Sequence, residues 1–259
     1  MASLSIARAD PLGPVRLAAR LAAALLLLIV MLPAHGLWRL ARQTSPWPRM
    51  FLGGVARIFG AEVEIVGRPL KRDVFFVANH LSWMDILVMA GATGTAFVAK
   101  SDVRDTPVVG WLATLNNTVF VARTDRGSVA TQVESVRAAV EAHQPITIFP
   151  EGTTGDGCGL LPFKASLLAV LAPPPRAMQV QPVLIDYGDA TRDMLWLGDE
   201  PGGENAQRIL KRAGDFGVRL TFLEPFDPAA MVDRKAIAAE ARARIAAAMS
   251  ASVPVAAAL

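Results

Sequence analysis

The sequence predicts an α/β domain with a largely parallel central sheet flanked by helices, preceded by an N-terminal apolar membrane-anchoring helix or helical hairpin. From about Ala61 onward, short β-branched and aromatic runs alternate with longer helical runs, and no repeat or long linker interrupts them. An uncharged run of fourteen residues, Leu21 to Ala34, lies before that region. We therefore expect an anchoring segment over residues 1–60, the main domain over 61–250 and a tail over 251–259.

The composition and the placement of charge indicate contact with lipid. Hydrophobic residues make up 53% of the chain and the mean hydropathy is +0.37, both high for a soluble enzyme. Residues 1–60 contain seven arginines and one acid, a net charge of +6, so the rest must carry −3 to give the total of +3. Basic residues around an apolar run are attracted to anionic lipid headgroups. Nucleic acid is disfavoured as a partner, because it calls for a basic face on the folded domain.

The way in which the segment meets the membrane stays open at this point. Fourteen residues are short for a span, which needs about 20, and Pro33 interrupts the run near its end. Trp38 and Trp47 follow at the place where interfacial aromatic residues would sit. A re-entrant or interfacial hairpin is at least as consistent as a span, a buried core helix remains an alternative, and a cleaved signal peptide is the least favoured. The stretch from Ser45 to Pro48 is the expected hinge between anchor and domain.

The main domain is expected to contain seven strands and several helices. The candidate strands are 62–66, 74–78, 95–99, 118–122, 146–149, 180–186 and 218–223. Val129, Val133, Val136 and Val140 recur at helical spacing and predict a helix with one apolar face. The alanine-rich stretch from Arg234 to Met249 predicts a closing helix.

The first motif that could carry chemistry runs from Asn79 to Asp85, directly after the strand at 74–78. A histidine at a strand end and an aspartate five residues later can bring an imidazole and a carboxylate together. Asp85 would then hold one ring nitrogen of His80 as a donor and leave the other free to accept a proton from a hydroxyl. A capping turn with a solvated Asp85 is the simpler alternative for this pair alone. Ser82 is a candidate nucleophile, although the chain has no G-x-S-x-G elbow.

The second motif is a loop from Phe149 to Gly159, which follows another strand. Four glycines within eight residues leave its backbone N–H groups available to an anion or an oxyanion. The loop has neither the Gly-Lys-Ser/Thr of a Walker A motif nor the G-x-G-x-x-G of a dinucleotide site. Taken in isolation, the loop is better explained as a flexible hairpin or turn.

The third feature is a pair of cations, Lys100 and Arg123, each just past a predicted strand. In a parallel sheet they would emerge beside His80 and Glu151 at the carboxyl edge, where the sites of open α/β sheets lie. Cations there would suit a phosphate or carboxylate headgroup. A zinc site is disfavoured, because the chain has no H-E-x-x-H motif and Cys158 is its one cysteine.

These features occur in four ordered blocks over residues 60–190, and together they resemble the 1-acylglycerol-3-phosphate acyltransferase (glycerolipid acyltransferase) family. The blocks are the His-x4-Asp motif at His80 and Asp85; Lys100, Pro107, Gly110 and Phe120-Val121-Ala122-Arg123; Phe149 to Thr153; and the apolar stretch around Pro182. The resemblance is specific, since it needs all four blocks in this order.

The resemblance implies that His80, oriented by Asp85, deprotonates the hydroxyl of a lysolipid, which then attacks an acyl thioester. The acceptor would be 1-acyl-sn-glycerol-3-phosphate, giving phosphatidic acid, and the thiol of coenzyme A or acyl carrier protein would leave. No metal, cofactor or acyl-enzyme is implied. We expect substrate contacts from Asn79, Lys100, Arg123, Glu151, Gly152, Thr153 and Lys164. It also implies a role in phospholipid biosynthesis, with membrane lipids as partners and an active site that faces the cytoplasm.

One position departs from the family pattern. Thr154 stands where the family has an arginine that binds the headgroup, which weakens the case for a lysophosphatidic acid acceptor. The stretch from Glu151 to Lys164 is similar to a branch that includes lyso-ornithine lipid acyltransferases, and Lys164 is the candidate replacement for the missing cation. A membrane-anchored hydrolase, with Asp85, Glu151 and Asp156 around a metal, and a non-catalytic lipid-binding protein are the competing hypotheses.

Overall fold

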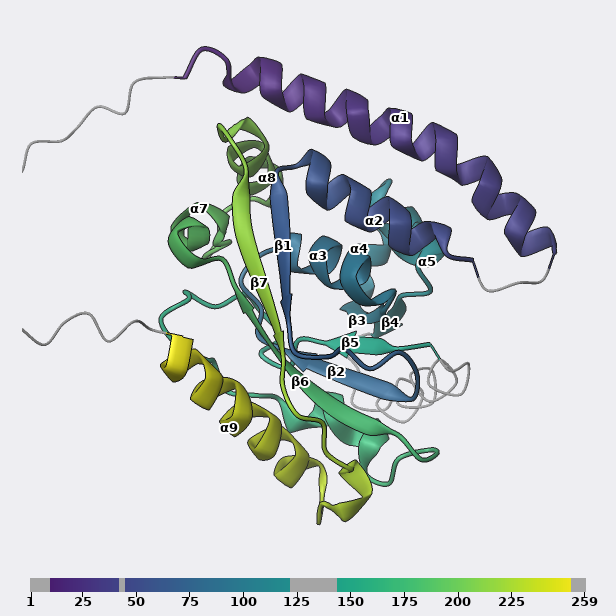
Figure 1. The fold of residues 1–259 in the computed structure, drawn as a ribbon, viewed down its shortest axis with the longest axis vertical. Coiled ribbons are helices and arrows are strands. Elements are labelled where there is room, and N and C mark those ends of the chain that lie inside the picture. Colours follow the sequence, from purple (N-terminus) through teal and green to yellow (C-terminus); the bar gives the residue numbers. More distant parts are fainter. Residues whose placement is uncertain (1–9, 42–44, 122–143, 253–259) are drawn as a thin grey trace, which may run out of the picture.

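The computed structural model describes residues 10–41, 45–121 and 144–252, and it shows an α/β fold with helices on both faces of one sheet (Figure 1). Over these residues the sheet has seven strands in the order β1-β7-β6-β2-β5-β3-β4. The strands are β1 (Ala61–Val66), β2 (Val74–Ala78), β3 (Ala96–Lys100), β4 (Val119–Val121), β5 (Ile146–Ile148), β6 (Gln179–Asp186) and β7 (Phe216–Phe222). All neighbours are parallel except β6 and β7. The predicted fold class and each predicted strand are confirmed.

The central strand β2 is buried on both faces, which explains its unbroken apolar sequence. Val74, Phe76 and Ala78 point into the core beneath α3, whereas Phe75 and Val77 point into a second core beneath α9. Alternate residues of a strand face opposite sides of a sheet, so a strand covered on both sides needs apolar residues throughout. β2 therefore gives the chain that follows it a rigid starting point.

The helices surround this sheet on both sides (Figure 1). They are α3 (Met84–Thr93), α4 (Ser101–Arg104), α5 (Val109–Leu115), α7 (Thr191–Met194), α8 (Gly202–Lys211) and α9 (Arg234–Ser252), with short 3-10 turns η2 (Ala165–Leu171), η3 (Gly188–Ala190) and η4 (Pro228–Ala230). The expected closing helix is α9, and Ile237 and Ile245 are buried on its inner face. The helix expected around Val129 to Val140 lies outside the described residues.

The N-terminal segment forms a pair of helices that lie together at the edge of the domain (Figure 1). α1 (Gly13–Leu40) has 28 residues, twice the length of the apolar run, and α2 (Trp47–Ile58) packs against it. α1 is long and apolar enough to cross a membrane, and its most apolar stretch is not buried inside the protein. It is therefore no buried core helix. The expected hinge is partly helical, because Trp47 and Pro48 form the first turn of α2, where proline is tolerated.

Three of the N-terminal arginines hold this helical pair to the domain. Arg20 of α1 donates to the carbonyls of Leu210 and Arg212 at 2.9 and 3.0 Å, and Arg16 donates to a third carbonyl at the end of α8 at 2.9 Å. Arg49 of α2 reaches two carbonyls in the last turn of α3 at 3.1 and 2.9 Å. The last carbonyls of a helix lack partners within it and carry partial negative charge. The basic residues of the anchor thus cap two helices of the domain.

α2 and α3 approach each other closely at a pair of glycines. A Cβ atom on Gly91 would lie 2.5 Å from the Cα atom of Gly53, far inside van der Waals contact. α2 and the residue that follows it also contribute Val55, Ala56 and Phe59 to the same core as α3. The absence of a side chain at both glycines therefore sets how closely the helical pair packs on the helix that carries Asp85.

We predict that Gly91→Ala destabilises the protein by about 1–3 kcal/mol, the usual effect of forcing an extra carbon into a packed interface. The matched control is Gly203→Ala in α8, where an added Cβ meets nothing within 4 Å. That variant should be about 0.5–1 kcal/mol more stable than wild type, because alanine favours a helix over glycine. The measurement is denaturant unfolding in detergent micelles, and equal stability of the two variants would contradict the close crossing.

Candidate active site

The site begins where β2 ends and the chain turns toward α3. Asn79 is 1% exposed, and both atoms of its amide bind the backbone of Ile185 in β6. Its Oδ1 accepts the N–H of Ile185 at 2.7 Å, and its Nδ2 donates to the carbonyl of Ile185 at 3.0 Å. The side chain thus continues the pairing of β2 with β6 for one more residue after the backbone leaves the sheet. This bond fixes the position of His80 at the carboxyl edge.

His80 and Asp85 form the pair that the sequence predicts. Nδ1 of His80 lies 2.8 Å from Oδ2 of Asp85, and the same oxygen accepts the backbone N–H groups of Leu81 and Ser82 at 2.7 and 2.9 Å. Asp85 is fully buried in the first turn of α3, where the helix dipole favours a negative charge. An ionised carboxylate can only accept a hydrogen bond, so the neutral imidazole that fits this contact has its hydrogen on Nδ1 and a lone pair on Nε2.

Tyr187 completes the surroundings of the carboxylate. Its hydroxyl lies 2.6 Å from the second oxygen of Asp85, Oδ1, and the residue is 2% exposed. Burial raises the pKa of Tyr187 well above its ordinary value, and the charge of Asp85 raises it further. The phenol therefore stays protonated and donates to Asp85.

Tyr187 was missed by sequence reasoning, although two signals point to it. It is the one tyrosine of the chain, and it directly follows β6, a strand that runs parallel to β2. Residues that follow neighbouring parallel strands meet at one edge of a sheet. A polar residue just past the strand around Pro182 was therefore a candidate neighbour of His80.

Three further contacts fix the orientation of His80. Its backbone N–H donates to Oε1 of Glu151 at 3.0 Å, and its carbonyl accepts the N–H of Gly155 at 2.7 Å. The imidazole ring stacks on Phe149, with the ring centroids 4.2 Å apart and the planes 16° apart. The side chain is 19% exposed, and Nε2 meets no hydrogen-bond partner within the part of the chain that the structure describes. Nδ1 of the ring is thus held by Asp85, whereas Nε2 is available for another hydrogen bond.

Glu151 ties the glycine-rich loop to His80. It is 3% exposed, and its second oxygen, Oε2, accepts the N–H of Leu161 at 2.9 Å. Burial raises the pKa of Glu151, while the hydrogen bonds from Leu161 and His80 oppose that rise. The two carboxylate oxygens therefore join the backbone of His80 to that of Leu161, just past the far end of the loop. The expected substrate contact of Glu151 stays a prediction, because the geometry shows a bracing role.

The remaining predicted residues lie around this centre or outside the described residues. Lys100, Thr153 and Lys164 are exposed, at the end of β3 and in the loop after β5. Gly152 adopts a φ of +70° that favours glycine. β3 and β5 run parallel to each other and β5 runs parallel to β2, so their ends reach the same edge as His80. Arg123 lies outside the described residues.

Thr154 carries no charge, and its side chain makes a structural hydrogen bond. Its hydroxyl donates to the carbonyl of Trp196, and the N–H of Trp196 donates to the carbonyl of Leu81 at 3.1 Å. The residue that replaces the family arginine therefore links the glycine-rich loop to the segment after α7. This position brings no positive charge to the site.

Two other expectations concern the alternative chemistries. Ser82 is fully buried, and its hydroxyl oxygen accepts the N–H of Met84 at 3.4 Å, so it does not face a substrate. Within residues 10–41, 45–121 and 144–252, no three His, Cys, Asp or Glu side chains gather as metal ligands would. The arrangement that remains is an oriented imidazole beside a loop rich in backbone N–H groups.

Comparison with known sequences finds acyltransferases among the similar proteins. A sequence model of the acyltransferase family matches residues 62–186. The lyso-ornithine lipid O-acyltransferase of Brucella abortus is 34% identical over 246 residues, which cover 88% of this chain and 91% of that protein. The enzyme of the same name from Rhodobacter capsulatus is 32% identical and covers 90% of each chain. A 1-acyl-sn-glycerol-3-phosphate acyltransferase of Neisseria gonorrhoeae is 37% identical over 105 residues, 39% of this chain and 41% of that protein.

Comparison with solved structures supports the fold. The crystal structure of PlsC, the 1-acyl-sn-glycerophosphate acyltransferase of Thermotoga maritima, superposes with a TM-score of 0.66 at 22% identity. The match covers 92% of this chain and 95% of that one, so it includes the N-terminal helices as well as the sheet. With 34% identity to a curated acyltransferase over nearly its whole length, this chain is an enzyme of the acyltransferase family.

Proposed function

We propose that this enzyme transfers an acyl group from a thioester to the hydroxyl of a lysolipid, with His80 as the general base. The observation that carries the proposal is the imidazole whose Nδ1 binds the buried Asp85 while Nε2 stays open. Nε2 takes the proton of the acceptor hydroxyl as its oxygen bonds to the thioester carbonyl carbon. The carbon–sulfur bond of the tetrahedral intermediate then breaks, and the leaving thiolate takes the proton back from His80.

The groups around His80 suit the other needs of this reaction. The N–H groups of Gly152 and Gly155 already donate to the carbonyls of Phe149 and His80, so the proposed donor to the oxyanion is another N–H group of the glycine-rich loop, first of all that of Thr153. Lys100, Arg123 and Lys164 are the proposed cations for the anionic part of the headgroup. The proposed acyl donor is a thioester of coenzyme A or acyl carrier protein, with no cofactor and no metal.

We propose a lyso-ornithine lipid as the acceptor, ahead of the lysophosphatidic acid that the sequence alone favours. Four lyso-ornithine lipid acyltransferases are 31–34% identical over 73–90% of this chain. Thr154 also supports this order, because it is uncharged and its hydroxyl is bound to Trp196. A phosphomonoester carries up to two negative charges and usually needs arginine, whereas an ornithine headgroup pairs one carboxylate with an ammonium. Lysophosphatidic acid remains the second candidate, supported by the Neisseria relative.

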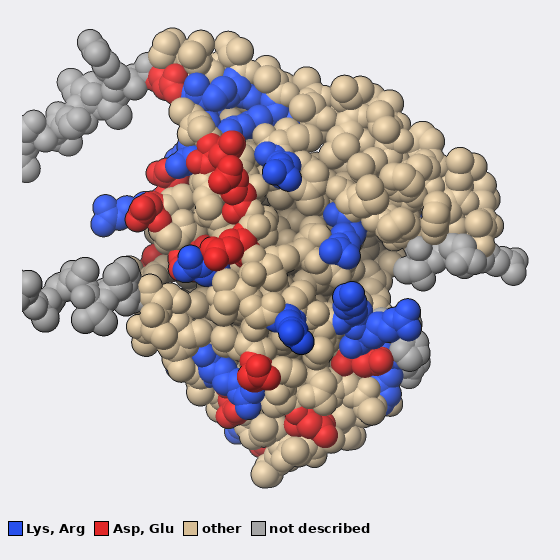
Figure 2. Space-filling view, viewed as in Figure 1, with Lys and Arg blue, Asp and Glu red and all other residues tan. Residues whose placement is uncertain are grey.

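We also propose that α1 and α2 form an interfacial hairpin that keeps the site at the cytoplasmic face of the membrane. Over most of α1, at the upper right of Figure 2, the visible surface carries no charged side chain. Arg16 and Arg20 hold the first turns of α1 to α8, and α2 returns along α1. A helix held to the domain along its length fits an interfacial position better than a perpendicular span.

We predict that His80→Ala lowers kcat by about 10²–10⁴-fold, the usual range for loss of a general base. Asp85→Asn should also cause a large loss, because an amide can select the wrong imidazole tautomer. Val232→Ala, at a position that is 96% exposed and outside the glycine-rich loop, is the control and should keep wild-type activity. The measurement is transfer of a labelled acyl group to lyso-ornithine lipid in micelles. Near-wild-type transfer by His80→Ala, or release of free fatty acid without any acceptor, would overturn the mechanism.

The role of Tyr187 is tested by Tyr187→Phe, which removes the hydroxyl and keeps the ring. The carboxylate of Asp85 then loses one of its four hydrogen-bond donors, and loss of a hydrogen bond to a charged group costs about 1.5–3 kcal/mol. We expect kcat to fall by about 10–100-fold while KM for the acceptor is unchanged, because Tyr187 acts through the position of Asp85 and His80. Wild-type kcat in a less stable variant would mean that Tyr187 only fills space.

The choice of acceptor is tested by Thr154→Arg. A guanidinium there should improve use of lysophosphatidic acid relative to lyso-ornithine lipid, because it adds a bidentate partner for the phosphate. The measurement is a competition between the two acceptors for one labelled thioester, with Thr154→Lys to separate charge from geometry. If the wild-type enzyme already chooses lysophosphatidic acid and Thr154→Arg changes nothing, the proposed acceptor is wrong.

A further inference from the structure

A cluster of exposed apolar side chains lies at the start of α5. Val108, Val109 and Trp111 are 62%, 53% and 45% exposed, and we refer to these three residues as the α5 apolar cap. A single exposed apolar residue needs no explanation, but three within four positions form a patch that water disfavours. We therefore expect the α5 apolar cap to be covered by a binding partner.

The backbone is held in a strained turn at this cap. The N–H of Val109 donates to the carbonyl of Pro107 at 2.7 Å, and Val108 between them has φ +64° and ψ −54°. This is the γ-turn with positive φ, which is rare and strained, and a β-branched residue suits it poorly. Next to it, a Cβ on Gly110 would overlap the carbonyl oxygen of Arg104, so α4 and α5 pack tightly. A strained backbone conformation of this kind persists only where the surrounding structure holds it in place, and such conformations are concentrated at functional sites.

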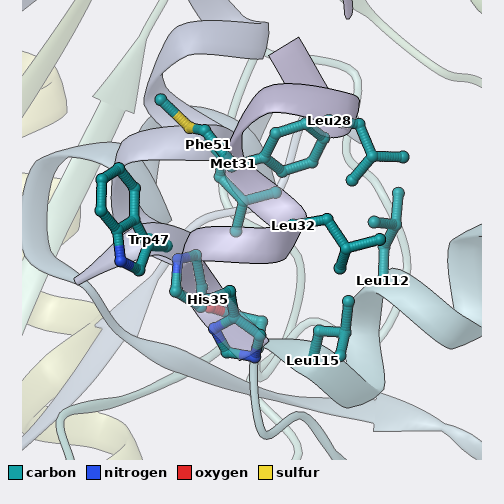
Figure 3. A pocket seen from close by; sticks show the side chains of 11 residues that line it. Leu28, Met31, Leu32, His35, Trp47, Phe51, Leu112 and Leu115 are labelled. Carbon is teal, nitrogen blue, oxygen red and sulfur yellow. The ribbon is translucent and has the colours of Figure 1, made fainter. Parts of the chain in front are cut away.

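The cap continues an apolar face that the anchor partly covers. Val108, Trp111, Leu112 and Leu115 recur at spacings of three and four, so they lie along one side of α5. Leu112 and Leu115 line an apolar cavity of about 40 Å³ with α1 and α2, and Figure 3 shows them next to Leu32 and His35 of α1. Val108 and Trp111 extend the same face beyond the part that α1 covers.

We propose that the α5 apolar cap inserts into the membrane interface beside the α1–α2 hairpin and forms a second lipid contact of the enzyme. The inference rests on the proposed membrane location. The cap is continuous with a face that already packs on α1, and tryptophan is enriched at membrane interfaces. A second protein is a poorer fit, because three side chains present far less than the roughly 800 Å² per partner of a standard protein interface.

The position of the cap gives the contact a consequence for the reaction. Lys100 ends β3, α4 follows at once, and the cap comes directly after α4. β3 ends at the same edge of the sheet as His80 and the loop of Glu151. Insertion of the cap therefore draws this edge toward the lipid surface from which a lysolipid must enter.

The test places one fluorescent probe on the cap and one on a matched valine elsewhere. In a Cys158→Ser background, Val108→Cys and Val232→Cys are each labelled with an environment-sensitive dye; Val232 is 96% exposed and lies between η4 and α9. The full-length protein is reconstituted into vesicles of phosphatidylcholine and phosphatidylglycerol, with and without lipids that carry a quencher near the headgroup. The probe at 108 should shift to the blue and be quenched, whereas the probe at 232 should do neither.

Equal behaviour of the two probes would overturn the proposal. A blue shift at position 108 that depends on protein concentration and is not affected by the lipid quencher would also overturn it, because that result would indicate contact with a second copy of this chain. This readout needs no activity, so its failure is distinct from failure of the proposed reaction.

A second variant, Val108→Gly/Trp111→Gln, removes two of the three apolar side chains while relieving the strain at position 108. It should raise KM for a lysolipid in vesicles by at least roughly tenfold, the loss expected when a single large apolar side chain leaves lipid. Its kcat with a dissolved short-chain acceptor should match wild type. An unchanged KM in vesicles would also overturn the proposal.

Discussion

The carboxylate of Asp85 is fully buried, and an isolated charge in that position would be strongly unfavourable. Four donors compensate it: the backbone N–H groups of Leu81 and Ser82, the imidazole of His80 and the phenol of Tyr187. These donors come from the turn after β2 and from the end of β6, while the carboxylate belongs to α3. The charge is therefore stable only when three separate elements are in place, and the same contacts give His80 its orientation.

The bracing residues around the pair follow from this requirement. Asn79 continues the pairing of β2 with β6, so it sets the distance between His80 and Tyr187. Glu151 fastens the glycine-rich loop to the backbone of His80. On the other side of α3, Gly53 and Gly91 let α2 pack closely, and Arg49 caps the end of the helix. The proposed membrane anchor is thus in direct contact with the helix that carries Asp85.

The strands and the His80–Asp85 pair could be predicted from the sequence, because both depend on residues close together in the chain. Tyr187 could not be assigned in the same way, since it meets Asp85 only after β6 pairs with β2. The sequence motifs include Asn79 and Glu151, but a motif alone does not show that the polar side-chain atoms of these residues bind backbone groups, as they do in the structure. α1 extends beyond the apolar run of residues 21–34 for a related reason. Arg16 and Arg20 precede that run in the sequence, and distant carbonyls of α8 accept hydrogen bonds from both.

The central claim is that Asp85 keeps His80 in the form that bears a hydrogen on Nδ1 and a lone pair on Nε2. The most direct measurement is ¹⁵N NMR of the histidine rings near neutral pH, with the His80 signals assigned by their absence in His80→Gln. We expect a protonated Nδ1 and an unprotonated Nε2 in the wild-type protein, and a change in this tautomer in Asp85→Asn. A hydrogen on Nε2 in the wild-type protein, or identical ring signals in Asp85→Asn, would contradict the account.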